Sequence, residues 1–288
     1  MLGGMMAGDA AIRVSGLIKR YGDSVAVDGL DLEVWRGETF ALLGPNGAGK
    51  TTTTEILEGY RKRDGGRVSV LGQDPQTADR RWRSRIGIVM QEPNDVYELT
   101  VAEIVRHFAG YFPRPRAVGE VIELVGLAGK ERKRTSALSG GQRRRLDVAL
   151  GIVGNPQVLF LDEPTTGFDP EARRQFWELI RSLRTAGTTI LLTTHYLEEA
   201  EQLADRAAVI SGGRIVALDE PRRLGGRDLA SSTVGWSDPR DGACTAQSDT
   251  PTKLIAELAA RYGGEVPGLT VTRPSLEDVY LQLIGQER

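Results

Sequence analysis

The sequence has little of what secreted or membrane-spanning chains use. It contains one cysteine, Cys244, in 288 residues, which excludes an intrachain disulfide and fits a reducing cytosol. The longest apolar runs, such as residues 158–161, are strand-sized and far below the ~20 residues that span a bilayer. The first ten residues lack both the charged and the apolar region of a signal peptide. We therefore expect a cytoplasmic chain that reaches a membrane only through a partner.

An excess of basic charge is also missing. The chain has 37 Lys and Arg against 39 Asp and Glu, a formal net charge of −2. This balance gives no electrostatic footprint for nucleic-acid binding, so we expect no nucleic-acid partner. With 40% hydrophobic residues the chain can bury a sizeable core. We expect one large domain over residues 10–225 and an accessory unit over residues 226–288.

The most informative stretch is GPNGAGKT. It lies between the apolar run TFALLG and a segment that can form a helix, so its glycines occupy a strand-to-helix turn. Such a turn directs backbone N–H groups and a helix N-terminus at an anion. We predict a phosphate cradle rather than a chance Gly-rich turn, with Lys50 reaching the outer phosphates and Thr51 ligating Mg2+. The predicted cradle residues are Gly44, Pro45, Asn46, Gly47, Ala48, Gly49, Lys50, Thr51 and Thr52.

Two carboxylates follow a second apolar run. VLFL at residues 158–161 predicts a parallel strand covered on both faces, and Asp162 and Glu163 lie at its carboxyl end, where open α/β sheets bind ligands. Because successive side chains of a strand point apart, one carboxylate can serve a metal and the other a water. His195 follows another buried strand at the same edge. It is a candidate phosphate sensor, with an ordinary loop histidine as the alternative.

The motif LSGGQ opens a predicted helix. Ser139 and Gln142 form a capping box, which alone would explain both residues. Gly140 and Gly141 fit that account less well, because each costs about 1 kcal/mol relative to alanine in a helix. Close approach of a phosphate to the helix N-terminus would require such a bare backbone. The arginines at 143–145 are predicted to lie on a solvated helix face.

Weaker signals surround these motifs. Tyr21, upstream of the cradle, can stack on adenine, with simple packing against a sheet edge as the alternative. Gln91 ends a short predicted strand and is a loop residue on its own evidence. Residues 92–137 have helical spacing and predict a helical insertion between core strands. Residues 222–248 are poor in apolar side chains and predict a linker or an irregular start of the accessory unit.

Five stretches in order, GPNGAGKT, Gln91, LSGGQ, VLFLDEP and His195, resemble the nucleotide-binding subunit of an ABC transporter over residues 12–224. The resemblance implies an α/β fold of the P-loop NTPase type. This fold has a mostly parallel sheet, an antiparallel β subdomain, the helical insertion and a small C-terminal α+β unit. Phe168 stands where the family usually has leucine, an apolar exchange of little consequence.

The resemblance also implies roles for single residues. Tyr21 would stack on adenine, Gln91 would couple the γ-phosphate and the metal to the helical insertion, and His195 would contact the γ-phosphate. Asp169 would lie in a loop that crosses to a second copy. The residues implied to complete the ATP site of that second copy are Ser139, Gly140, Gly141 and Gln142.

We interpret the chain as an ATPase that binds ATP and Mg2+ and dimerises around ATP. It would power a separate integral membrane permease from the cytoplasmic face of the cell membrane. Thr51, Gln91 and Asp162 would hold the metal, and Glu163 would activate the attacking water. The tail motif RPSLEDVYLQLIG resembles the drug- and polyketide-antibiotic-export branch, in which ATPase and permease are separate chains. We therefore expect a multidrug or antibiotic exporter.

Two other functions stay open. One is a soluble ABC-type ATPase that acts on the ribosome or on DNA. Translation factors of that kind usually carry two cassettes, whereas this chain has one cradle and one LSGGQ. Chromosome-type relatives insert a long coiled coil, and the segment between Lys50 and Leu138 has no sustained heptads. The other is an import ATPase, which the cassette motifs do not distinguish from an export ATPase.

Overall fold

The computed structural model describes residues 10–90 and 98–285. The chain divides into two compact units, Met1–Val216 and Ala217–Arg288. Among the described helices, none is both long enough and apolar enough to cross a membrane.

A six-stranded sheet forms the centre of the first unit, in the order β5-β6-β7-β3-β8-β9. Its strands are β3 (Thr39–Leu43), β5 (Ile86–Val89), β6 (Val158–Asp162), β7 (Thr189–Thr194), β8 (Arg206–Ser211) and β9 (Arg214–Asp219). β5 pairs with β6, β6 with β7, and β3 with both β7 and β8, all in parallel. β3 and β7 are buried along their whole length, as expected for parallel strands covered on both faces.

The register of this sheet brings the chemical residues to one edge. Leu43 at the end of β3 is opposite Thr194 at the end of β7, and Asp162 at the end of β6 is opposite Thr193. The cradle follows β3, the carboxylates close β6 and His195 follows β7. All three groups therefore meet at the carboxyl ends of adjacent parallel strands.

A second sheet is antiparallel, as predicted. It has the order β2-β1-β4, formed by β1 (Ala10–Tyr21), β2 (Ser24–Trp35) and β4 (Gly65–Val70). The short helix α2 (Arg80–Arg83) is attached to the end of β4. The buried indole of Trp82 donates from Nε1 to the Val70 carbonyl at 2.8 Å. Apolar residues of both sheets and of the cradle helix share one core.

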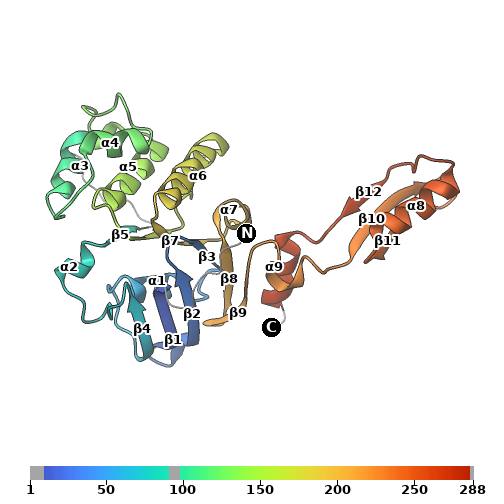
Figure 1. Ribbon diagram of the computed structural model, residues 1–288, viewed down its shortest axis with the longest axis horizontal. Coiled ribbons are helices and arrows are strands. Elements are labelled where there is room, and N and C mark those ends of the chain that lie inside the picture. The colour runs from blue at the N-terminus through green and yellow to red at the C-terminus, as the bar shows by residue number, and fades with distance from the viewer. Residues whose placement is uncertain (1–9, 91–97, 286–288) are drawn as a thin grey trace. The chain divides into compact units, whose positions relative to one another are not determined.

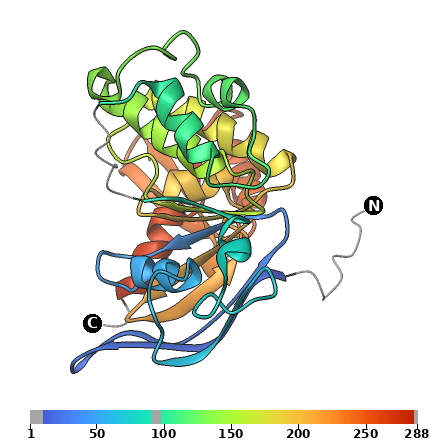
Figure 2. The same cartoon turned by 90° about the vertical axis from the view of Figure 1, so that its left-hand side faces the viewer.

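Helices cover the central sheet and extend beyond it. They are α1 (Lys50–Leu57), α3 (Val101–Ala109), α4 (Val118–Leu124), η1 (Thr135–Ala137), α5 (Gly140–Ile152), α6 (Pro170–Thr185) and α7 (Leu197–Leu203). Figures 1 and 2 show α3, α4 and α5 grouped at one end of the first unit and strands β1, β2 and β4 at the other. α5 packs on both α3 and α4 and also on β5, so it joins the predicted helical insertion to the sheet.

The second unit has its own small sheet and core. It contains η2 (Leu224–Gly226), β10 (Ser232–Asp238), β11 (Gly242–Ser248), α8 (Pro251–Tyr262), β12 (Thr270–Thr272) and α9 (Leu276–Gly285). The sheet has the order β11-β10-β12, and its core is built on Val234, Leu258 and Val266.

The interpretation of residues 222–248 as a linker or irregular segment is wrong where β10 and β11 form a hairpin. Thr245 and Gln247 of β11 are exposed, so one face of the hairpin carries polar side chains and the composition of the segment hides its strands.

Candidate active site

The turn between β3 and α1 has the strand-turn-helix form that the sequence predicts. Gly47 and Gly49 have φ values of 81° and 105°, where glycine is favoured. A Cβ at Gly44 would lie 2.5 Å from the Ile210 carbonyl oxygen, and one at Gly49 would lie 2.4 Å from the Ala26 carbonyl oxygen. Neighbouring backbone therefore passes too close for any other residue at these two positions.

A cavity of about 580 Å³ opens at this turn, a volume suited to a small-molecule ligand. It is lined from the cradle, from the end of β6 and from the end of β7. The lining residues are Ala26, Asn46, Gly47, Gly49, Lys50, Thr51, Thr52, Glu163 and His195. The structure thus brings Glu163 and His195 to the cradle, from which each is more than a hundred residues away in the sequence.

Lys50 lies at the start of α1 with its ammonium held by the cradle itself. Its Nζ donates to the carbonyls of Gly44 at 2.8 Å and Pro45 at 3.1 Å, and the residue is 5% exposed. Burial lowers the pKa of Lys50, while the nearby carboxylates of Glu163 and Asp162 raise it. A buried cation whose partners are neutral carbonyls is well placed to accept an anionic ligand.

Asp162 is tied to two hydroxyl groups. Thr51 Oγ1 donates to its Oδ2 at 3.4 Å, and Thr193 Oγ1 donates to its Oδ1. A hydroxyl and a carboxylate side by side are ligands that Mg2+ uses together with phosphate oxygens. In the described parts of the chain no three His, Cys, Asp or Glu side chains cluster as a metal site. Such a cluster is not needed where substrate phosphates complete the coordination. Gln91, the remaining predicted ligand, lies outside the described residues.

Glu163 and His195 face each other across the cavity wall. Glu163 Oε2 lies 3.3 Å from His195 Nδ1, and the side chains are 12% and 40% exposed, respectively. Glu163 has a φ of 44°, which is uncommon for a residue with a side chain. Its N–H donates to the Thr193 carbonyl at 3.1 Å. The pair offers a proton acceptor with a second titratable group in direct contact.

Arg144 is not on a solvated helix face, so that prediction is wrong. The residue is 8% exposed. Its Nε donates to the Pro164 carbonyl at 2.9 Å, and its Nη2 donates to the carbonyls of Asp162 at 2.9 Å and Glu163 at 3.3 Å. Its Nη1 donates to the Met90 carbonyl. These carbonyls lie at or just beyond strand ends, where the sheet ladder supplies few donors.

A helical spacing could have found Arg144. Val148 and Ile152 follow at intervals of four, and both are almost fully buried. The run of three arginines at 143–145 hides this spacing, because identical neighbours do not show which of them faces inward. Arg145 points elsewhere and bonds to Gln175 on α6.

The start of α5 has the predicted capping box. The Gln142 N–H donates to Ser139 Oγ at 3.3 Å, and Gln142 Oε1 accepts from the Ser139 N–H at 3.3 Å. A Cβ at Gly140 or Gly141 would meet nothing within 4 Å. The residues that the structure describes therefore give no steric reason for either glycine. These four residues are not part of the cavity lining.

Two further predicted residues also lie away from the cavity lining. Tyr21, at the end of β1, is 42% exposed, and its ring centroid lies 5.4 Å from Lys19 Nζ and 5.3 Å from Arg61 Cζ. Asp169 is the N-cap of α6, with its Oδ1 accepting from the Ala172 N–H at 2.8 Å.

Comparison with known proteins decides the family. A family model described as "ABC transporter" matches residues 27–166. The Nod factor export ATP-binding protein I of Ralstonia nicotianae is 40% identical over 96% of this chain and 94% of its own length. The chain belongs to the ABC transporter family. The ABC ATPase is also 40% identical to the daunorubicin/doxorubicin resistance ATP-binding protein DrrA of Streptomyces peucetius, over 96% of this chain and 92% of that protein.

The fold of the ABC ATPase agrees with solved cassettes. CbiO1 of Clostridium perfringens, described as part of the ABC transporter complex cbiONQ, matches with a TM-score of 0.69 and 30% identity. The match covers 75% of this chain and 90% of CbiO1. The resemblance to ABC exporter ATPases and the predicted P-loop NTPase fold are both confirmed, and the chain is an ATP-binding ATPase subunit.

Proposed function

We propose that this ABC ATPase hydrolyses ATP with Glu163 as general base, sandwiches the nucleotide between two copies of itself and powers a separate membrane permease. The transported molecules would be drug- or antibiotic-like, and transport would be outward. The observation that carries the proposal is that the cradle, Glu163 and His195 line the same cavity.

The cradle residues bind and orient the phosphate chain. Lys50 exchanges its bonds to the Gly44 and Pro45 carbonyls for phosphate oxygens, which charge-assisted hydrogen bonds favour. Thr51 and Asp162, with Gln91, would hold Mg2+, which when bound neutralises charge on the phosphates. Tyr21 would stack on the adenine.

Glu163 takes the proton of the attacking water as its oxygen bonds to the γ-phosphorus and the bond to ADP breaks. The Glu163 side chain lines the cavity, so its carboxylate is placed beside the space that the attacking water would occupy. His195, 3.3 Å from Glu163, is in reach of both the base and the γ-phosphate and would hold the latter in line.

The start of α5 supports the sandwich. Ser139 and Gly140 are exposed, and no contact among the described residues explains the bare backbone of Gly140 and Gly141. A phosphate of ATP bound to a second copy would use that backbone and the helix N-terminus. Asp169, at the next helix start, would lie at the same dimer contact.

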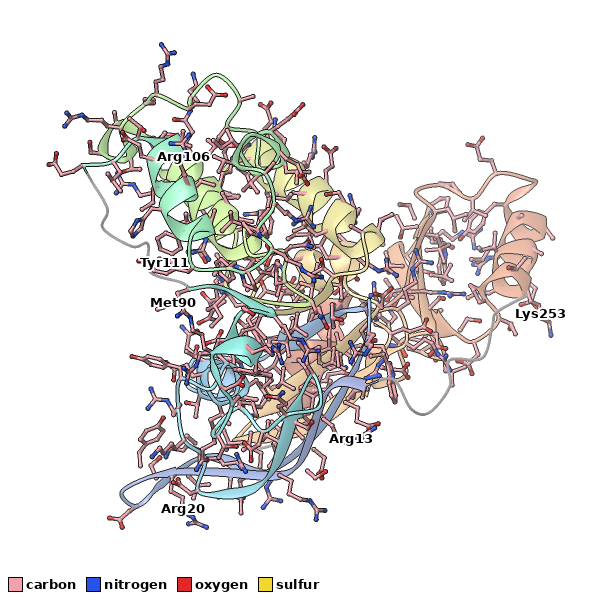
Figure 3. The ribbon with its side chains drawn as sticks, turned by 60° about the vertical axis from the view of Figure 1, so that its left-hand side comes forward. Arg13, Arg20, Met90, Arg106, Tyr111 and Lys253 are labelled. Carbon is pink, nitrogen blue, oxygen red and sulfur yellow. The ribbon has the colours of Figure 1, made fainter. Side chains whose placement is uncertain are left out.

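A hollow on the first unit supports a protein partner. It measures about 420 Å³ and is lined from α2 and from residues 110–113, including Tyr111 and Phe112. Tyr111 and Met90 are each 54% exposed, and Figure 3 shows them on the same side of this unit. Exposed apolar groups beside a hollow are typical of a protein contact. The names of the relatives, a Nod factor export protein and a daunorubicin resistance protein, support export.

The test uses two carboxylate variants. Glu163→Gln should keep ATP binding, lose about 10²-fold or more in hydrolysis and form an ATP-dependent dimer. Asp162→Asn should weaken Mg2+ binding and form no dimer under the same conditions. Steady-state hydrolysis and size-exclusion chromatography with light scattering distinguish them. Hydrolysis at the wild-type rate by Glu163→Gln would contradict the role of Glu163 as general base. ATP binding by this variant without dimerisation would contradict the proposed dimer around ATP.

A further inference from the structure

We infer that Arg144 is a positioning residue for hydrolysis: it fixes the backbone that carries Glu163 and ties it to the helix that begins with Ser139. The inference rests on the proposed role of Glu163 as base. Arg144 does not line the cavity, so it would act through Glu163.

One guanidinium holds carbonyls of two strand ends. The guanidinium bonds to the carbonyl of Asp162, the last residue of β6, to those of Glu163 and Pro164 just after it, and to that of Met90 just after β5. The three consecutive carbonyls on the β6 side leave that turn little freedom. The Met90 bond fixes the turn relative to the neighbouring strand.

The turn needs this support because its backbone is unusual. Glu163 lies at a φ of 44°, a conformation that persists only where surrounding contacts over-determine it. Its N–H is held by the Thr193 carbonyl at 3.1 Å and its carbonyl by Arg144 at 3.3 Å. Removing the guanidinium frees the carbonyl side and lets the carboxylate move away from the water.

Arginine suits this place better than lysine. Its planar fork donates from both edges at once, whereas an ammonium is a compact point charge. Burial lowers the pKa of Arg144, while Asp147, Asp162 and Glu199 raise it, and the guanidinium remains charged at neutral pH. The surrounding carboxylates thus make a buried cation tolerable without forming the bonds that position the turn.

The same contacts connect the base to the proposed dimer surface. Arg144 and the capping box at Ser139 belong to one helix, α5. A change in the position of α5 when a second copy's ATP contacts its N-terminus would be transmitted to the Glu163 backbone through a single side chain.

Kinetics of point variants test the inference. Arg144→Met and Arg144→Lys should lower kcat about 10- to 100-fold with KM for ATP changed less than about threefold, the pattern of a misplaced catalytic group. Arg145→Met is the matched control, since it removes a guanidinium of the same helix that bonds to Gln175 and the Gly126 carbonyl. Its kcat should stay within about threefold of wild type. The lysine variant keeps charge and bulk, so it gives an answer even where the methionine variant is poorly folded.

A double-mutant cycle separates positioning from general stability. In the Glu163→Gln background the residual rate should fall little further on Arg144→Lys, because residues that act as a unit are non-additive. Full additivity of the two losses would overturn the inference and leave Arg144 as a purely structural residue.

The inference and the proposed function fail differently. Wild-type kcat in both Arg144 variants, with Glu163→Gln inactive, would overturn the inference alone. Wild-type hydrolysis in Glu163→Gln would instead contradict the role of Glu163 as base, and the inference on Arg144 would then have no catalytic group to act on.

Discussion

At the scale of single residues, Lys50 offers the most direct test of the cradle. Its buried ammonium lies among the carbonyls of the turn, and replacing it by alanine removes a charge-assisted bond to phosphate. We expect Lys50→Ala to weaken ATP binding about 10- to 100-fold, in line with hydrogen bonds to charged groups. Titration with a fluorescent ATP analogue measures this. Arg13→Ala, which removes an exposed ion pair with Glu33, is the control. Unchanged affinity in Lys50→Ala would argue against the cradle.

Tyr21 predicts how selective the site is for the base. Stacking on an aromatic ring reads no base edge, so wild-type affinities for ATP and GTP should agree within about tenfold. Tyr21→Ala should weaken both nucleotides by a similar factor of about 10- to 100-fold. Competition titrations measure both affinities. Rejection of GTP a thousandfold by wild type would contradict the stacking role.

Asp147 predicts a pH dependence of stability. Burial raises its pKa to about 6, although Arg144 and Arg143 lower it. The folded state therefore binds more protons than the unfolded state between the ordinary value near 3.8 and about 6. Protonated Asp147 therefore favours the folded state over the unfolded state. This contribution to stability is complete below pH 3.8 and is lost as the pH rises through about 6.

The variant Asp147→Asn tests this sign. Its stability relative to wild type should rise by about 1 kcal/mol between pH 5 and pH 7.5, because most of the effect of a shift from 3.8 to about 6 has already developed at pH 5. Urea unfolding of the nucleotide-free protein at the two pH values gives the difference, in which other titrating groups cancel. An equal difference between the two proteins at both pH values would show that Asp147 has no raised pKa.

At the scale of the element, the N-terminus of α5 separates stability from function. Alanine at Gly140 or Gly141 meets no neighbour, so each substitution should stabilise the protein by about 0.5–1 kcal/mol. Each should also abolish the ATP-dependent dimer in the Glu163→Gln background, because a Cβ would occupy the place of the second copy's phosphate. Thermal unfolding and light scattering measure the two effects.

Gly119 provides the matched control. It is exposed within α4, and a Cβ there would also meet nothing within 4 Å. Gly119→Ala should raise stability by a similar amount and leave dimerisation intact. Dimers that persist in Gly140→Ala and Gly141→Ala would show that these glycines do not face nucleotide.

The elements that the sequence predicts well are those with a strong local reason. A fixed glycine spacing marks the cradle, and a capping box marks the start of α5. The β10-β11 hairpin could not be predicted because buried positions of β10 include the polar Ser232 and Asp238, so apolar residues do not alternate regularly along the strand. The burial of Arg144 follows from its helical spacing, but its partners could not be predicted, because they are backbone carbonyls between 18 and 54 residues away in the sequence.

At the scale of the whole molecule, the second unit should be dispensable for hydrolysis. Its core is separate, and every proposed chemical residue precedes residue 217. A chain ending at residue 225, which keeps β9, should retain kcat within about threefold of full length, as expected where a boundary separates independent domains. ATPase assays on the purified truncation check this. A folded but inactive truncation would assign the second unit to the active machinery.

The partner of the whole molecule can be identified by purification. The full chain, affinity-tagged and expressed in its own cell, should bring down an integral membrane protein after detergent extraction. Tyr111→Asp, which puts a charge in the hollow beside Phe112, should reduce that recovery without changing ATP binding. Tyr60→Asp, at another exposed aromatic, is the control. Recovery of ribosomes or DNA in place of a membrane protein would exclude the permease.

The carbonyls that hold Lys50 have a consequence for repeated turnover. After product leaves, the ammonium does not stay behind as an orphaned buried charge, because Gly44 and Pro45 accept it again. Because Gly44 and Pro45 belong to the turn, their bonds to Lys50 also hold its shape, which lowers the cost of ordering the turn when nucleotide binds. Lys50 thus has hydrogen-bond acceptors both with nucleotide bound and after product has left, which favours product release and the binding of the next nucleotide.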